Sequence, residues 1–373
     1  MSARISSACL WFSIFAILFC ATEPAAAQDD LNRLIELPPG FTIQEYATVP
    51  NARSMCLSDN GVLFVGTRRS SVYAVRDMDG DGRGEQVDVI AEDLAQPNGV
   101  AWRDGSLYVA EISRVTRYDN IENRIENPPL PVLIKDDYPT DRHHGWKYIA
   151  FGPDGYLYVP VGAPCNVCDE ENDIYASITR IRPDGSDFSI VAHGVRNTVG
   201  FNWDPLTGDL WFTDNGRDRM GDDIPPDELN HLTSPGQHFG FPFCHGGEIV
   251  DPDLGRGKSC ADYRKPVQNL GPHVAALGML FYTGDQFPGE YQNQVFIAEH
   301  GSWNRSEKIG YRVTLVRLNE NREAISYEVF ASGWLREGEQ VIGRPVHVLQ
   351  MPDGSMLVSD DFAGKIYRIS YSG

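Results

Sequence analysis

The sequence predicts an all-β protein that folds as a six-bladed β-propeller. Six short segments repeat one pattern, in which a turn residue is followed by a strand of aliphatic, aromatic and β-branched residues. Their starts lie 44 to 85 residues apart, which leaves room for four short strands in each repeat and for a large insertion before the fifth. Repeats of this period build blades or a solenoid, and the strand-rich composition favours blades. The six segments are 61–65, 105–109, 155–159, 208–212, 293–297 and 354–358.

The first strand of each predicted hairpin carries the candidate site residues. The repeated segments follow other β-like runs across turns such as Asn60-Gly61 and Asp104-Gly105, a pattern typical of hairpins. In a propeller this first strand lies nearest the axis, so the starts of these strands meet at one mouth of the channel. We therefore expect three arginines, a histidine and two amides to converge there. They are Arg53, Asn98, His144, Arg196, Asn197 and Arg344.

The two ends of the folded chain are predicted to close the ring. Residues 41–46 and 365–371 both have strand-like sequences. Pairing between them would remove the exposed edges that an open ring of blades leaves. We therefore expect residues 28–373 to form a single propeller domain.

Residues 1–27 are typical of a signal peptide. Arg4 precedes an apolar run over residues 10–21, and Ala25-Ala26-Ala27 offers the small residues of a cleavage site. The run is too short for a membrane helix, which needs about 20 apolar residues. We therefore expect a bacterial protein that is periplasmic or secreted, without stable membrane insertion. Its net charge of −20 also argues against nucleic acid as a partner.

Five cysteines follow residue 27. In an oxidising compartment Cys165 with Cys168, and Cys244 with Cys260, are plausible disulfide pairs. Cys56 is then left as a small buried apolar side chain. Other pairings stay open, and Cys165-x-x-Cys168 has a second interpretation as a redox motif.

The predicted group of arginines has two interpretations. Guanidinium groups that face each other in a narrow channel repel, so an anion such as a carboxylate is expected between them. A histidine among them would have a lowered pKa and would be a neutral base. Alternatively, the arginines pair with the acids that end the neighbouring strands, namely Glu111, Asp214, Glu299 and Asp360.

Five runs of the sequence resemble the soluble sugar dehydrogenases that depend on pyrroloquinoline quinone (PQQ), and the sorbosone dehydrogenase-like branch is the most similar. The resemblance extends over roughly residues 38–371, and this family folds as a six-bladed propeller. The five runs are 96–100, 143–155, 159–168, 194–197 and 343–346.

The resemblance implies roles for individual residues. His144 matches the family's general base, and Arg196 with Asn197 matches the pair that binds the quinone. Arg344 matches an arginine that binds a cofactor carboxylate. Gly216 and Arg217 fall near the turn whose backbone carbonyls hold calcium.

At three positions the chain departs from the glucose-oxidising members of the family. His300 replaces a lysine that binds the cofactor, and Val346 replaces a second arginine. The glutamine expected in the second repeat is either Gln96 or has been replaced by Asn98.

The activity that the resemblance implies is oxidation of an aldose or a sugar aldehyde. The base would remove the hydroxyl proton while hydride moves to a quinone polarised by Ca²⁺ and Arg196. An external quinone or cytochrome would then accept the electrons. Two alternatives stay open: a calcium-dependent lactonase-type hydrolase with Asn98, Asn197 and Asp214 as ligands, and a binding propeller without a cofactor.

Two acidic segments are candidate calcium sites outside these repeats. Asp77, Asp79 and Asp81, followed by Gly82, match the first half of a calcium-binding loop, although Asp88 stands where a glutamate is usual. The alternative is a solvated turn rich in aspartate. A second group could hold calcium beside the cofactor or be a solvated loop, and it comprises Asp222, Asp223, Asp227 and Glu228.

Overall fold

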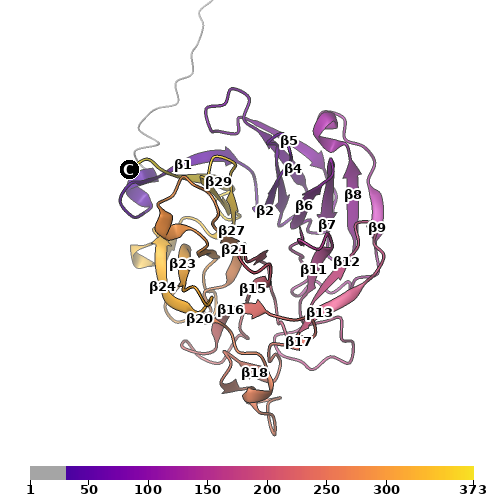
Figure 1. Cartoon of the computed structure of the whole chain (residues 1–373), viewed down its shortest axis with the longest axis vertical. Coiled ribbons are helices and arrows are strands. Elements are labelled where there is room, and N and C mark those ends of the chain that lie inside the picture. The colour runs from indigo at the N-terminus through magenta and orange to yellow at the C-terminus, as the bar shows by residue number, and fades with distance from the viewer. Residues whose placement is uncertain (1–30) are drawn as a thin grey trace, which may run out of the picture.

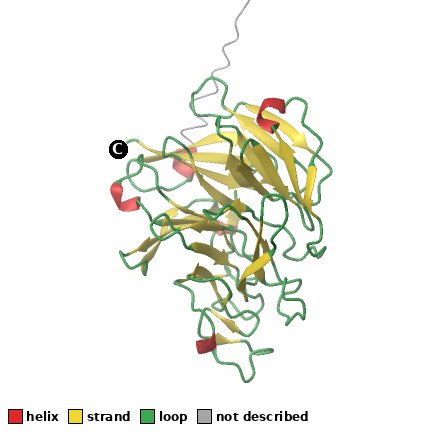
Figure 2. Cartoon of the chain, turned by 45° about the vertical axis from the view of Figure 1, so that its right-hand side comes forward, coloured by secondary structure: helices red, strands yellow, loops and turns green. Residues whose placement is uncertain are grey.

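Each repeated segment forms the second strand of a four-stranded antiparallel sheet, and six such sheets surround a central axis (Figure 1). This computed structural model describes residues 31–373, so the predicted signal peptide lies outside the described part of the chain. The six-bladed propeller is confirmed. Strands dominate the fold, and the helices are single short turns (Figure 2). Within residues 31–373, none of the helices has the length and hydrophobicity needed to cross a bilayer.

The first three blades follow one another along the chain, and their strands are ordered from the axis outward. Blade three gains a fifth, parallel strand, β17, from a later segment. The strands are β2 Ala52–Leu57, β3 Leu63–Thr67, β4 Val72–Arg76 and β5 Gln86–Ala91 in blade one; β6 Gly99–Arg103, β7 Ser106–Ala110, β8 Val115–Asp119 and β9 Val132–Lys135 in blade two; and β10 Ala150–Phe151, β11 Leu157–Val161, β12 Ser177–Ile181 and β13 Ser189–His193 in blade three.

Blades four and five continue this order, and blade six combines both ends of the described chain. The strands are β14 Phe201–Trp203, β15 Leu210–Asp214, β16 Pro226–Leu232 and β20 Gln268–Pro272 in blade four; β21 Ala276–Phe281, β22 Val295–Glu299, β23 Arg312–Leu318 and β24 Ala324–Ala331 in blade five; and β27 Pro345–Gln350, β28 Met356–Asp360, β29 Lys365–Tyr371 and β1 Phe41–Thr48 in blade six.

The predicted insertion before the fifth repeat lies between β16 and β20 and protrudes from the ring (Figure 1). The Cys244–Cys260 disulfide cross-links it. The Cys165–Cys168 disulfide is present as well, so both predicted pairs are confirmed, and Cys56 is free and partly buried. The remaining short elements are β17 Gln237–His238, β18 Cys244–His245, β19 Ile249–Val250, β25 Leu335–Arg336, β26 Gln340–Val341, η1 Ile121–Arg124, η2 Cys260–Asp262, η3 Gly289–Tyr291 and η4 Glu337–Glu339.

Closure of the ring follows the predicted pairing. β1 runs antiparallel to β29, with Phe41 opposite Tyr371 and Ile43 opposite Ile369. Phe41 also contacts the ring edges of Phe287 and Phe330 in blade five, at centroid distances of 4.8 and 5.1 Å. Each aromatic pair of this kind contributes about 0.5–1.5 kcal/mol beyond the burial of its area. The N-terminal strand is therefore fixed to two blades at once.

The innermost strands contact their neighbours around the axis: β2 touches β6 and β27, and β21 touches β14 and β27. Their starts meet at one mouth, as predicted, with one local difference. His144 does not begin a strand, because β10 starts only at Ala150. His144 instead lies in a turn, with a φ of 50°.

Ring closure predicts a global effect of one side chain. Phe41→Ala should lower the free energy of unfolding by about 3–5 kcal/mol, since it removes a buried ring that joins two blades. Urea unfolding followed by tryptophan fluorescence measures this as a shift of the main transition. Ile325→Ala, on an outer strand with 65% of the side chain exposed, is the control and should change stability by no more than about 0.5 kcal/mol. A separate early transition in the Phe41 variant, with the main one unmoved, would contradict this role.

Candidate active site

A cavity of about 430 Å³ opens at the mouth where the first strands begin. The sequence-predicted residues that line it are Arg53, His144, Arg196, Asn197, Gly216, His300 and Arg344. Asn98 lies behind the wall, where it is fully buried and accepts a hydrogen bond from Arg53 Nε at 2.6 Å. The remaining candidates, Arg217 and the Asp77 loop, lie outside the lining. The structure thus brings together most of the predicted group.

Arg196 is held by a short loop that the Cys165–Cys168 disulfide closes. Its Nε donates to the Asn166 carbonyl at 2.8 Å, and its Nη2 donates to the Asn166 side-chain oxygen at 2.9 Å. Nη2 also donates to Asp218 at 3.1 Å. Because the guanidinium is 3% exposed, these acceptors replace the water it loses on burial. The arrangement fixes one wall of the cavity.

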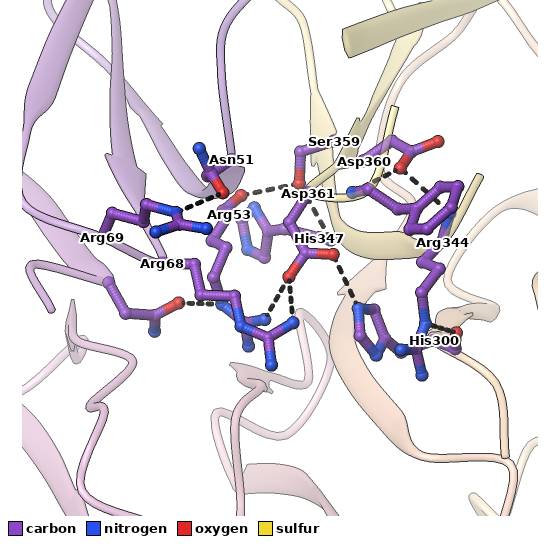
Figure 3. A network of polar contacts seen from close by, with 12 residues as sticks. Asn51, Arg53, Arg68, Arg69, His300, Arg344, His347, Ser359, Asp360 and Asp361 are labelled. Carbon is purple, nitrogen blue, oxygen red and sulfur yellow. Dashed lines mark hydrogen bonds and ion pairs between the residues drawn. The ribbon is translucent and has the colours of Figure 1, made fainter. Parts of the chain in front are cut away.

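Asp361 is the buried carboxylate that organises the opposite wall (Figure 3). It accepts from Arg53 Nη1 at 2.7 Å and from His300 Nε2 at 2.8 Å, and Arg68 Nη1 lies 3.6 Å away. Burial alone would raise the pKa of Asp361, but His300 and Arg53 outweigh it and lower this pKa. Asp361 is therefore an anion that accepts two hydrogen bonds and forms a longer ion pair with Arg68.

His300 and His144 are both neutral in this environment. Burial lowers the pKa of His300 to about 4, although Asp361 opposes the shift. Burial and the nearby charges of Arg196 and His143 hold the pKa of His144 well below its ordinary value. His144 Nδ1 lies 2.8 Å from the Ala163 carbonyl oxygen, which can only accept. The proton is therefore on Nδ1, and Nε2 keeps a lone pair.

Arg344 differs from the other two predicted arginines. Its Nε donates to the His300 carbonyl at 3.0 Å and its Nη2 to the Gly301 carbonyl at 2.8 Å. No carboxylate within residues 31–373 lies within 4 Å of its guanidinium. The side chain is thus ordered, but its charge is not neutralised.

The acids that end the strands do not pair with these guanidiniums, so that alternative is wrong in detail. Asp214 accepts the backbone N–H groups of Arg196 and Asn197 at 2.8 and 2.6 Å. Asp360 accepts the N–H of Arg344 in the same way at 2.9 Å. Glu111 and Glu299 pair instead with Arg114 and Arg312. Two of the four strand-end acids therefore position site loops through the backbone.

Gly216 and Asp227 form the part of the lining that fits a cation. Asp227, 1% exposed, accepts the N–H groups of Gly216 and Ala276, both at 2.9 Å. Burial raises the pKa of Asp227 to about 7. A buried carboxyl group without an ion-pair partner in the described chain suits Ca²⁺, which binds oxygen ligands. Asp227 and Glu228 are thus buried and not part of a solvated loop.

The side chain of Arg217 turns toward the insertion. Its guanidinium pairs with Asp251 and Asp253 at 2.6 and 3.0 Å. The three ligands expected for the lactonase alternative do not all face the cavity. Only Asn197 lines the cavity, whereas Asn98 and Asp214 are buried and engaged with their neighbours.

The loop between β4 and β5 brings Asp77, Asp79, Asp81 and Glu85 together, with carboxylate oxygens within 4.8 Å of one another. Asp88 is not among them, because it lies in β5 and pairs with Arg76 at 2.9 Å. Several of these acids also accept N–H groups of the loop: Asp77, for example, accepts from Gly80 and Gly82. Glu85, three residues earlier than expected, takes the closing position.

Sequence reasoning missed several residues of the cavity. Asp361 directly follows Asp360, and Asn166 lies between the two cysteines of the C-x-x-C motif. Both residues could have been found, because they lie beside positions that the sequence had singled out. No sequence pattern marks Arg68 or Trp303, because each is a single arginine or tryptophan within a loop. The missed lining residues include Arg68, Arg142, Asn215, Asp218, His273, Trp303 and Asn304.

The cavity fits an anionic cofactor such as PQQ, which carries three carboxylates. Five arginines line it, against the two carboxyl groups of Asp218 and Asp227. This excess of positive charge occurs in a chain with a net charge of −20. Val346, where the glucose-oxidising members carry a second arginine, packs with Val199 and Leu277 in an apolar cluster. Arg53 and Arg68 place cations in the same cavity.

Comparison with known proteins shows a family match in the sequence and a shared fold in solved structures. A sequence model of the Glucose / Sorbosone dehydrogenase family matches residues 109–368. An uncharacterized protein of Borreliella burgdorferi is 31% identical over 378 residues, which cover 97% of each chain. The holo PQQ domain of pyranose dehydrogenase from Coprinopsis cinerea superposes with a TM-score of 0.78 at 19% identity, covering 90% of this chain and 97% of the other.

A second solved structure has the same fold. The PQQ-bound aldose sugar dehydrogenase of Streptomyces coelicolor superposes with a TM-score of 0.64 at 19% identity. The match covers 90% of this chain and all of the other. At these identities the structural matches establish the shared propeller fold.

Removing the negative charge of Asp361 should lower the free energy of unfolding. Asp361→Asn leaves Arg53 buried without its ion-pair partner, and breaking a buried pair in this way typically costs about 3–5 kcal/mol. The loss should appear as a lower free energy of unfolding in urea. Asp104→Asn is the control, because its pair with Arg103 is exposed and is worth no more than about 1 kcal/mol. Equal small losses in both variants would show that Asp361 does not organise the wall.

Calcium should stabilise the loop between β4 and β5. Four carboxylates within 4.8 Å repel, and a divalent cation relieves this repulsion. Wild-type protein should melt at a higher temperature in calcium than in chelator, and Asp79→Ala should reduce that difference. The exposed Asp136 provides the control substitution, Asp136→Ala. An undiminished difference in the Asp79 variant would assign the stabilising ion to another site.

Proposed function

Because the chain belongs to the glucose/sorbosone dehydrogenase family, we propose that it oxidises an aldose or sugar aldehyde in the axial cavity with PQQ and Ca²⁺ bound. One observation carries the proposal above all others. A neutral histidine presents an unprotonated ring nitrogen in a cavity whose arginine charges exceed its carboxylates. That combination suits removal of a hydroxyl proton beside an anionic cofactor.

Arg344, Arg196 and Asn197 would hold PQQ, with His300 beside them, and Gly216 and Asp227 would hold the calcium. Bound PQQ would supply a quinone that accepts hydride, and calcium would polarise this quinone. The chain itself contributes fixed donors. Arg196 and Arg344 are already ordered by carbonyl acceptors, so little side-chain freedom is lost on binding.

His144 would act as the general base. The Ala163 carbonyl fixes its tautomer, and the lowered pKa keeps the ring neutral at neutral pH. Protonation would require a pH below the ordinary histidine pKa of about 6.5. The base is thus in its active form throughout the neutral range.

The proposal extends to the location of the protein, its sugar substrate and its electron acceptor. We propose that residues 1–27 direct export and are removed, leaving residues 28–373 as one catalytic domain in the periplasm or outside the cell. Sorbosone or a glucose-like aldose would be the sugar, and an external quinone or cytochrome the final electron acceptor. The excess of negative charge gives no support to a nucleic-acid partner.

Reconstitution tests the proposal directly. Apo-protein titrated with PQQ and calcium should show quinone absorbance changes that saturate at micromolar PQQ, and the loaded protein should reduce a dye when an aldose is added. Failure to bind PQQ under these conditions would refute the assignment. Acid release from a lactone by the same preparation would support a hydrolase instead.

Two substitutions should separate the base from the cofactor clamp. His144→Ala should retain PQQ but lose about 10²–10⁴ in turnover, the usual contribution of a positioned base. Arg344→Ala should mainly weaken PQQ binding, because its role is charge pairing. Steady-state dye reduction and PQQ titration measure the two effects.

The control for this pair is His231→Ala, which removes a histidine outside the cavity that pairs with Asp209.

Wild-type turnover should stay level from pH 8 to about 6.5 and decrease only at lower pH, because the His144 pKa is depressed. Wild-type turnover in the His144 variant would remove this residue from the mechanism.

A further inference from the structure

We propose that the sugar oxidised here carries an anionic group, a carboxylate or a phosphate, which binds in a groove beside the cavity. This inference rests on the proposed function and names the substrate class for it. The groove encloses about 450 Å³, and we call it the arginine groove. Its lining residues are Asn51, Arg68, Arg69, Gln96, Trp146, Arg344, Asp361 and Phe362.

The arginine groove adjoins the cavity, and Arg68, Trp146 and Arg344 line both. Its other residues come from the same mouth. Arg69 follows β3 and Phe362 follows β28, so the groove lies where blades one and six meet (Figure 3). We infer that a ligand in the cavity reaches the groove past the three shared side chains.

The groove offers guanidinium donors that no protein group uses. The Nε of Arg69 donates to Asn51 at 3.4 Å, and neither Nη atom of Arg69 has a partner within residues 31–373. Arg344 also lines the groove, but the proposed function assigns its charge to a PQQ carboxylate, so Arg68 and Arg69 are the cations left for a second anion. Arg68 stacks over Trp146 at 5.4 Å, so its head group is ordered. Arg68 and Arg69, which are adjacent in the sequence, thus present their planar guanidinium groups to the groove.

The single carboxylate in the groove does not balance this charge. Asp361 is 1% exposed at its side chain, accepts from Arg53 and His300, and lies 3.6 Å from Arg68 Nη1. It leaves Arg69 without a carboxylate partner within residues 31–373. Like charges at short distance repel, and the repulsion is relieved by an anion with paired oxygens. Carboxylate and phosphate both have this geometry, which matches the guanidinium fork.

Two further features of the groove suit a sugar. Gln96 lines the groove with an amide side chain, a group that hydrogen-bonds sugar hydroxyls. Phe362 is 60% exposed and offers an apolar face. Arg69 lines the groove but not the cavity, which makes it a specific probe of the anionic group.

The test compares glucuronate, glucose 6-phosphate and glucose as substrates of the protein loaded with PQQ and calcium. We expect kcat/KM to be at least about tenfold higher for one of the two anionic sugars than for glucose, and the preferred one identifies carboxylate or phosphate. Arg69→Ala should reduce that ratio about tenfold, the usual contribution of a hydrogen bond to a charged group. Added salt should reduce the ratio in wild type as well.

Arg256→Ala is the matched control, because it removes an exposed arginine in the insertion, and it should leave the ratio unchanged. A wild-type preference for glucose, or an Arg69→Ala variant with an unchanged ratio, would overturn the proposal. Loss of PQQ affinity in Arg69→Ala would overturn it too, since the groove would then serve the cofactor.

A binding measurement separates this inference from the proposed function. The preferred anionic sugar should raise the melting temperature of the apo-protein more than glucose does, and Arg69→Ala should abolish this difference. If no sugar is oxidised but this shift occurs, the dehydrogenase assignment fails and the anion site stands. If neither anion shifts the wild-type melting temperature beyond the effect of glucose, the anion site is wrong.

Discussion

Closure of the ring is the constraint on which the site depends. Blade six contains strands from both ends of the described chain, because β1 pairs with β29. This pairing aligns β27 and β28 with the inner strand of blade one, so Arg53 and Asp361 meet at 2.7 Å although 308 residues separate them. An open ring would separate that carboxylate from that guanidinium and leave Arg53 without its carboxylate partner.

The site depends equally on how buried charge is compensated. Arg53 and Arg196 are almost fully buried, and each is held by a carboxylate together with amide or carbonyl oxygens. Such compensation is required, because a buried charge that loses its partner is strongly destabilising. Arg344 is compensated only by carbonyl dipoles, and Arg69 by a single amide oxygen. The positive potential that remains is directed at the cavity and the arginine groove, where an anion would bind.

The two neutral histidines show how backbone and side-chain partners select different tautomers. The Ala163 carbonyl places the proton of His144 on Nδ1, whereas Asp361 places the proton of His300 on Nε2. Both rings remain neutral because burial disfavours the imidazolium form. One residue type therefore presents Nε2 as the acceptor at one wall and Nδ1 at the other.

The sequence by itself determined the blades, the closure and most of the residues at the mouth. Strand periodicity and turn residues are local signals, and a propeller places every inner strand start at the same mouth, so Arg53 and Arg344 could be placed there from the repeat spacing. The family resemblance singled out His144, which lies in a turn ahead of its strand. The sequence also favoured both disulfides, although it left other pairings open. It could not reveal that Asp361, and not a strand-end acid, pairs with Arg53, nor that Asp227 is buried beside Gly216. Those outcomes depend on which loops pack against each other across blades, and only the tertiary structure decides which charges lose their water and must find partners there.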